Sequence, residues 1–164
     1  MKCFKIVIFL LTFSAYSQEV ELRWADRIKT KTYVSILGGK DGTYFTKHKD
    51  DDKRLVCRSY DQNMKLKNEK VVSFNLDSKK YNYLDAYFVK DKIIHFISDF
   101  NRKTDKNLLF AGVTDLNLNT SKDTFIVDEA DEKVSEFGSR NISPDSTKIV
   151  VYNERKGKRK DPSI

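Results

Sequence analysis

Short runs of β-branched and aromatic residues, separated by turns of Asp, Asn, Lys and Gly, dominate this sequence of 164 residues. The runs are TYVSIL at 32–37, GTYFTKH at 42–48, RLVCRSY at 54–60, KIIHFIS at 92–98, NLLFAGV at 107–113, TFIV at 124–127 and TKIVVYN at 147–153. Runs of this length and composition are typical of strands. The weakly periodic segment at 19–30 is interpreted as strand or loop, so the sequence predicts an all-β fold.

The strand pattern repeats at an interval near 50 residues. A turn around an aspartate precedes an apolar strand and a polar hairpin tip three times, at Asp41, Asp91 and Asp145. In the first two segments a second strand follows and ends in Asp61 or Asp115. Asp41 and Asp91 are 50 residues apart, and Asp61 and Asp115 are 54 residues apart. Because two independent markers agree on the interval, chance is a poor explanation of the similarity.

A repeat near 50 residues with about four short strands per unit is the signature of β-propeller blades. One four-stranded sheet cannot cover both of its faces, so blades pack on their neighbours around an axis. We therefore expect a partial propeller of about two and a half four-stranded blades. The expected segments are a lead-in at 18–31, units at about 32–81 and 82–134, and an incomplete unit at 135–164. On this prediction the chain stops within its third repeat and is a fragment of a longer propeller.

The segment NISPDSTKIVVYN at 141–153 resembles the Ser-Pro-Asp hairpin of the WD40-like repeats in TolB-type propellers of exported bacterial proteins. The resemblance is weaker at Lys40–Gly42, where Lys replaces Pro, and at Lys90–Lys92. In that family the turn joins adjacent strands of one blade. The resemblance therefore implies structural roles for five turn residues, which are Asp41, Gly42, Asp91, Pro144 and Asp145. Proline presets φ at the start of such a turn, and aspartate accepts a nearby backbone N–H.

The wider pattern DGTYF … YDQNMKLKNEKVVSF, followed by ISPDSTKIVVYNE, is similar to a group of uncharacterised exported proteins of the Bacteroidetes. The likeness spans most of the chain after residue 17. It implies no activity and no catalytic residues.

The first seventeen residues have the pattern of a secretory signal peptide. Two lysines precede an apolar run at about 6–13, and small side chains at Ala15 and Ser17 precede Gln18. The alternative of an uncleaved anchor is disfavoured, because a bilayer-spanning helix needs roughly 20 apolar residues. We expect cleavage before Gln18 and export to the periplasm, the outer membrane or the extracellular space. No transmembrane segment is expected after cleavage.

Cleavage also removes Cys3, so that Cys57 is the one remaining thiol and no internal disulfide can form. Cys57 lies in the apolar run RLVC. A small buried core residue is the favoured interpretation, and a reactive thiol is the alternative.

We predict no catalytic, cofactor-binding or metal-binding residues. The sequence contains no G-x-S-x-G, H-E-x-x-H, Walker A or C-x-x-C motif. His48 and His95 occupy similar repeat positions a full blade apart, which favours ordinary strand positions over a shared metal. Strand alternation places His95 on the opposite face from Ile94 and Phe96. The three contiguous carboxylates at 50–52 lack the alternating spacing of calcium loops and predict an exposed hairpin tip.

Charge gives little support to a nucleic-acid partner. The formal net charge of +7 includes Lys2 and Lys5, so cleavage would leave +5, spread mostly as single lysines beside aspartates. The basic tail RKGKRK at 155–160 aligns with earlier hairpin tips and lacks interleaved aromatic residues for base stacking. The acidic segment DEADEK at 128–133 is expected to form a solvated loop between blades.

Three classes of function stay open. The favoured one is an exported, non-enzymatic binding or scaffold module whose partner is a protein or an envelope component, by analogy with the broad loop face of propellers. The second is a glycan- or peptide-processing propeller enzyme whose site lies in blades outside this sequence. The third is an envelope structural protein that self-associates, since open sheet edges can pair.

Overall fold

The computed structural model describes residues 32–76, 81–131 and 135–155, which form strands and turns without a helix. The strands are β1 (Ser35–Lys40), β2 (Thr43–Lys49), β3 (Leu55–Tyr60), β4 (Leu66–Val71), β5 (Asn82–Val89), β6 (Lys92–Asn101), β7 (Lys106–Thr114), β8 (Phe125–Asp131), β9 (Ser135–Ile142) and β10 (Ile149–Arg155). All their pairings are antiparallel, so the all-β prediction is confirmed. A helix with the length and apolar character to span a membrane is not found in these ranges. The predicted signal peptide, the whole lead-in at 18–31 and all of the basic tail after Arg155 lie outside the described residues.

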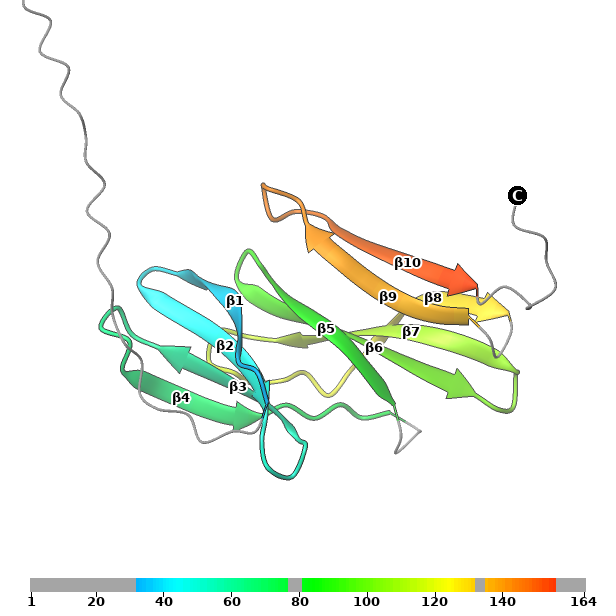
Figure 1. The fold of residues 1–164 in the computed structure, drawn as a ribbon, viewed down its shortest axis with the longest axis horizontal. Helices are drawn as coiled ribbons and strands as arrows, with labels where there is room; N and C mark the ends of the chain where they lie inside the picture. Colours follow the sequence, from blue (N-terminus) through cyan, green and yellow to red (C-terminus); the bar gives the residue numbers. More distant parts are fainter. Residues whose placement is uncertain (1–31, 77–80, 132–134, 156–164) are drawn as a thin grey trace, which may run out of the picture.

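The strands form three consecutive sheets (Figure 1). The first has the order β1-β2-β3-β4, the second β5-β6-β7-β8, and the third is the hairpin of β9 and β10. Within each sheet the strands pair with their neighbours in sequence, because the connections between them are too short for a crossover. In the described part of the chain the sheets do not close into a ring.

The sequence predicts a loop for DEADEK at 128–133. This prediction is wrong for the first four residues, which belong to β8. Asp128 and Glu129 pair with Leu109 and Leu108 of β7. Because β8 is an edge strand, exposed acidic side chains are compatible with it.

The second sheet is covered on both faces. On one face Ala86 and Ile93 pack against Phe45 and Cys57 of the first sheet. On the opposite face a cluster that includes Phe96, Leu109 and Ala111 packs against Phe137, Ile149 and Val151 of the third sheet. The 0% exposure of Cys57 confirms that it is a core residue, and burial raises the pKa of its thiol to about 12.

Gly38 brings β1 close to β5. It follows a register shift between Ile36 and Gly38, has a φ of 148°, and would place a Cβ 3.1 Å from the Cβ of Phe88. A side chain here would therefore be strained and would displace Phe88. The Phe88 ring instead stacks on Phe45 of the first sheet, with centroids 5.3 Å apart. The approach of Gly38 to Phe88 thus places β1, the first strand of one sheet, beside β5, the first strand of the next.

Candidate functional site

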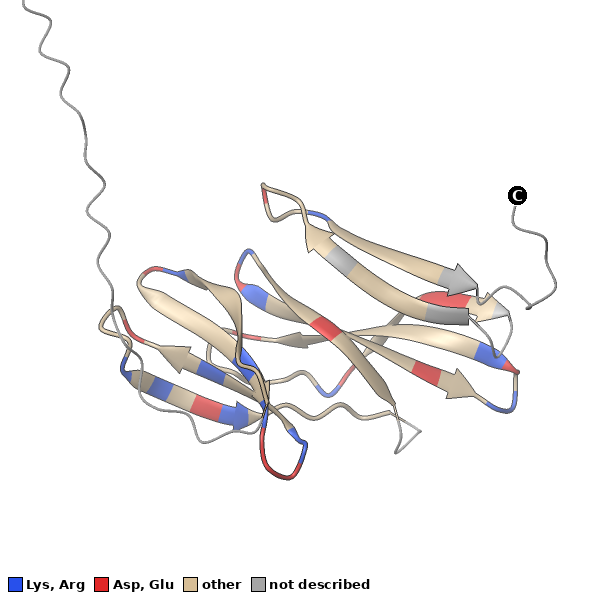
Figure 2. Ribbon diagram, viewed as in Figure 1, with Lys and Arg blue, Asp and Glu red and all other residues tan. Residues whose placement is uncertain are grey.

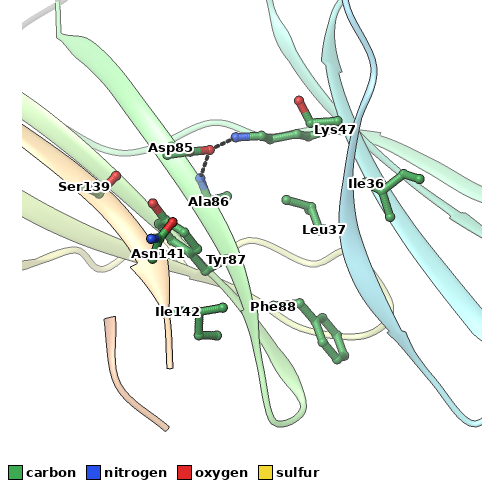
Figure 3. A pocket seen from close by; sticks show the side chains of 11 residues that line it. Ile36, Leu37, Lys47, Asp85, Ala86, Tyr87, Phe88, Ser139, Asn141 and Ile142 are labelled. Carbon is green, nitrogen blue, oxygen red and sulfur yellow. Dashed lines mark hydrogen bonds and ion pairs between the residues drawn. The ribbon is translucent and has the colours of Figure 1, made fainter. Parts of the chain in front are cut away.

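The first strands of the three sheets border one cavity of about 640 Å³ (Figure 3). This volume is within the range of small-ligand sites. Its lining residues are Ser35, Ile36 and Leu37 of β1, Lys47 of β2, Asp85, Ala86, Tyr87 and Phe88 of β5, and Ser139, Asn141 and Ile142 of β9. All of them belong to strands, so the wall of the cavity is set by sheet packing and not by loops.

An ion pair joins two sheets at the cavity wall. Lys47 of the first sheet donates to the carboxylate of Asp85 in the second (Figure 3). The same carboxylate oxygen accepts the backbone N–H of Ala86 at 2.8 Å. The Lys47 ammonium also lies 5.4 Å from the centroid of the Tyr83 ring, within cation–π range. The side chain of Lys47 is only 12% exposed, so its charge depends on these partners.

The lining combines polar and apolar side chains. Lys47 and Asp85 are its charged members and they neutralise each other. Figure 3 shows Phe88 and Ile142 at the end of the cavity away from this pair. The Ser139 hydroxyl is buried in the wall without a hydrogen-bond partner. Such an arrangement suits an uncharged ligand with both polar and apolar parts.

A buried polar chain supports this wall from the side of the second sheet. The Tyr83 hydroxyl lies 3.1 Å from Nδ1 of His95, and Nε2 of His95 lies 3.0 Å from Oγ1 of Thr114. Thr114 in turn lies 2.9 Å from the Thr120 hydroxyl. Burial, followed by the charge of Lys47, lowers the pKa of His95 to about 3, so the imidazole is neutral at pH 7. Burial also raises the pKa of Tyr83.

The position of His95 agrees with the prediction from alternation. Its side chain contacts Phe74 and Tyr83, whereas Ile94 and Phe96 join the cluster on the other face of the sheet. Sequence analysis missed Tyr83 and Thr114, since neither stands out in a tyrosine- and threonine-rich strand protein.

The five predicted turn residues lie in three hairpin turns. Asp41 and Gly42 have φ values of 49° and 72° and connect β1 to β2. Lys90 and Asp91 connect β5 to β6, and here Lys90 has the positive φ of 53°. Asp91 is therefore the second residue of its turn, as Gly42 is in the first turn. The sequence repeat had instead aligned Asp91 with Asp41, which is the first residue of its turn.

In the turn between β9 and β10, Pro144 follows Ser143 and precedes Asp145. The Asp145 carboxylate accepts hydrogen bonds from the Ser143 hydroxyl at 2.5 Å and from the N–H of Thr147 at 3.2 Å. These bonds hold the pKa of Asp145 below its usual range. Ser146 has a φ of 53°, which closes the turn.

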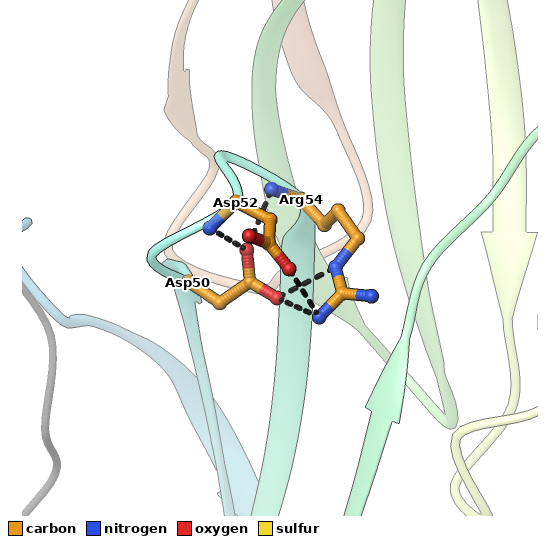
Figure 4. A network of polar contacts seen from close by, with 3 residues as sticks. All are labelled: Asp50, Asp52 and Arg54. Carbon is orange, nitrogen blue, oxygen red and sulfur yellow. Dashed lines mark hydrogen bonds and ion pairs between the residues drawn. The ribbon is translucent and has the colours of Figure 1, made fainter.

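The contiguous carboxylates after β2 form a hairpin tip, as predicted (Figure 4). Asp50 accepts the backbone N–H groups of Asp52 and Arg54 at 3.0 and 2.8 Å, and the Arg54 Nε–H at 2.7 Å. The Arg54 guanidinium holds the pKa of Asp50 below its usual range. Over the described ranges, no group of three or more His, Cys, Asp or Glu side chains is placed to bind a metal ion.

Asp61 and Asp115, the second pair of repeat markers, have matching structures. The Oδ1 atom of Asp61 accepts the N–H groups of Asn63 and Lys65, and Oδ1 of Asp115 accepts those of Asn117 and Asn119. The fourth residue of each turn has a positive φ, 61° at Met64 and 62° at Leu118. Leu118 is 1% exposed and packs in the core between the first two sheets. One of these turns is thus part of the contact between repeats.

Comparison with protein-family models, with curated proteins and with solved structures gives no match to this chain. The class that its own geometry defines is an all-β protein of consecutive antiparallel meanders with a strand-lined cavity.

Proposed function

We propose that this chain is an exported, propeller-like binding module that holds its ligand in the cavity bordered by β1, β5 and β9. One observation carries the proposal. The first strands of three successive sheets, far apart in sequence, meet around a single cavity of about 640 Å³. In a propeller the first strand of each blade lines the central channel, so the same arrangement supports a blade-like role for the three sheets.

The distribution of charge agrees with a binding role for the cavity. Figure 2 shows Lys, Arg, Asp and Glu at the hairpin turns and along β4, and acidic bands on β5, β6 and β8. The acidic residue of β5 is Asp85, whose charge is matched by Lys47. A cavity with paired charges attracts neither anions nor cations strongly, which favours a neutral surface of a protein or envelope component.

The same lining supports the non-enzymatic part of the proposal. Glycoside hydrolysis commonly requires two carboxylates, one of them free to exchange a proton. Asp85 is the carboxylate of the cavity lining, and Lys47 and the Ala86 N–H both bind it. The unsatisfied Ser139 hydroxyl is a better match to ligand binding, because a hydrogen bond from a ligand would offset the free energy of its burial.

Ligand binding in the cavity is tested with a variant whose larger side chain fills the cavity. Ser35 lines the cavity and is exposed, so Ser35→Trp should fill the space without disturbing the core. Ser73→Trp is the matched control, since Ser73 is exposed and does not line the cavity. Amide NMR spectra are titrated with neutral tripeptides and with N-acetylglucosamine oligomers. We expect shifts at cavity residues in the wild type and in Ser73→Trp, and their loss in Ser35→Trp. Absence of cavity shifts with every probe would refute the proposal.

Export is tested separately by expression of the whole sequence in a bacterium. The expected product lies outside the cytoplasm and begins at Gln18 on N-terminal sequencing. A cytoplasmic product that retains Met1 would contradict export and leave the cavity result unaffected.

A further inference from the structure

The two four-stranded sheets each end in an exposed edge strand. Within the described residues β4 pairs only with β3, and β8 pairs only with β7. Each edge therefore presents backbone N–H and C=O groups that can pair with another strand. Neither strand lines the 640 Å³ cavity, so this surface is separate from the proposed ligand site.

Strand β8 has unusual side chains for a solvent-exposed edge. Phe125, Ile126 and Val127 are consecutive and are 53%, 59% and 41% exposed. Asp128 and Glu129 follow them directly and are also exposed, and Glu129 is bound to Lys106 of the same sheet. A hydrophobic edge strand of this kind can pair with a further strand. Its acidic half favours a partner strand with basic side chains.

Strand β4 has the complementary pattern. Leu66 and Val71 at its two ends are 42% and 47% exposed. Between them Lys67 and Lys70 are exposed, and Glu69 is bound to Arg58 of the same sheet. Among the described side chains, the charges without an ion pair on this edge are thus the positive ones of Lys67 and Lys70, whereas on β8 it is the negative charge of Asp128.

We propose that β4 of one copy of this chain pairs antiparallel with β8 of a second copy. With Val71 opposite Phe125, the same register places Lys70 opposite Ile126 and makes Lys70 a diagonal neighbour of Asp128. Apolar side chains then meet at one end of the pair, and the long side chain of Lys70 reaches the Asp128 carboxylate. Cross-strand pairs of both kinds stabilise antiparallel sheets.

Charge disfavours the two symmetric alternatives. Antiparallel pairing of β8 with β8 around Val127 makes the Asp128 carboxylates of the two copies diagonal neighbours. Antiparallel pairing of β4 with β4 that sets Leu66 opposite Val71 places Lys67 opposite Lys70 twice. Like charges on facing strands are destabilising, so the mixed pairing is preferred.

The mixed pairing is heterologous, since it uses different surfaces of the two copies. Each added copy leaves one β4 edge and one β8 edge open, so assembly continues into a chain or closes into a ring. A single strand pair is a small interface, and the association is accordingly weak and dependent on concentration.

The test is sedimentation velocity of the purified protein over a wide range of concentration. We expect the mean mass to rise above that of one chain, and to fall when salt screens the attraction between Lys70 and Asp128. Two variants each block one edge: Val127→Pro alters β8 at a residue that has no partner in the register with β7, and Lys67→Glu/Lys70→Glu alters β4. A matched control, Lys103→Glu/Lys148→Glu, changes two exposed lysines in the β6–β7 and β9–β10 turns, which do not flank β4 or β8. Far-UV circular dichroism verifies that every variant is folded.

Each edge-blocked variant alone should stay monomeric, and the control should assemble like the wild type. An equimolar mixture of the two blocked variants should form dimers and stop there, because one supplies the intact β4 and the other the intact β8. A wild type that is monomeric at every concentration overturns the proposal. So do assembly that survives both sets of substitutions and a mixture that stays monomeric.

Discussion

Lys47 on β2 and Asp85 on β5 form an ion pair that links the first sheet to the second. The two partners are unequally buried, since the side chain of Lys47 is 12% exposed and that of Asp85 is 41% exposed. Lys47 therefore relies on Asp85 more than Asp85 relies on Lys47. This asymmetry determines how the pair responds to substitution.

Replacement of Asp85 by Asn should lower the free energy of unfolding by about 1–3 kcal/mol, because it leaves the Lys47 ammonium largely buried without its counter-charge. The partial exposure of Asp85 keeps the effect below that of a fully buried pair. Lys47→Met should cost less, because it removes the charge and keeps an apolar stem beside Tyr83. Urea unfolding at pH 7 measures both. A larger loss for Lys47→Met than for Asp85→Asn would contradict the inferred asymmetry.

Stability should fall as pH decreases from about 6.5 toward 3, in part because of His95. Its pKa is about 3 in the folded chain, against 6.5 as its ordinary value, so the unfolded state binds the extra proton in this window. His95 thus contributes a slope of up to about 1.4 kcal/mol per pH unit. Burial also lowers the pKa of His48, which adds to the trend in the same direction.

The contribution of His95 is isolated by comparing the wild type with His95→Phe in urea unfolding between pH 5 and pH 8. The variant should lose stability at pH 8, where it removes the hydrogen bonds to Tyr83 and Thr114, and should show a shallower dependence on pH. Parallel curves for the two proteins would show that His95 does not titrate on unfolding.

Asp115→Ala should destabilise the chain more than Asp61→Ala, although both remove the same two backbone hydrogen bonds. The turn at Asp115 holds Leu118 in the core, whereas Met64 in the matching turn is half-buried. We expect losses of about 1–2 kcal/mol at Asp115 and about 0.5–1 kcal/mol at Asp61. Thermal unfolding with the exposed Asp123→Ala as the control checks the order. Equal losses would mean that the turn at Asp115 does not support packing between the sheets.

A further effect of pH is expected at Asp115. Partial burial tends to raise the pKa of Asp115, but hydrogen bonds from Asn119 and Asn117 outweigh it and hold the pKa below its usual range. The stabilisation from this lowered pKa is present above the unfolded value near 3.8 and is lost as pH falls through the folded value. The difference between the wild type and Asp115→Ala should therefore shrink in strong acid.

Gly38→Ala should lower the free energy of unfolding by about 1–3 kcal/mol, since the added Cβ meets Phe88 and the φ of 148° disfavours a side chain. The double variant Gly38→Ala/Phe88→Ala should lose less than the sum of the two single losses, because the clash is then absent. Urea unfolding of the four proteins measures this coupling. Strict additivity would show that the approach of β1 to β5 does not depend on Gly38.

The sequence predicted the strands that have one apolar face or a long apolar run, such as β6 and β7. It missed β4, whose residues are all exposed and whose strand is formed by backbone pairing with β3. It also missed β5, because a strand that packs on both sides has no simple alternation. β9 was missed as well, since Gly138 and several polar residues interrupt its apolar pattern.

The sequence by itself determined the all-β class, the hairpin turns and the face of β6 on which His95 lies, because strand alternation and turn chemistry act over a few neighbouring residues. Only the tertiary structure decided that Lys47 meets Asp85, 38 residues away, and that β1, β5 and β9 border one cavity. Contacts of this kind depend on which face of one sheet packs against the next. That choice results from the summed burial of many distant side chains, such as Phe45, Phe88 and Leu118, and no local pattern encodes it.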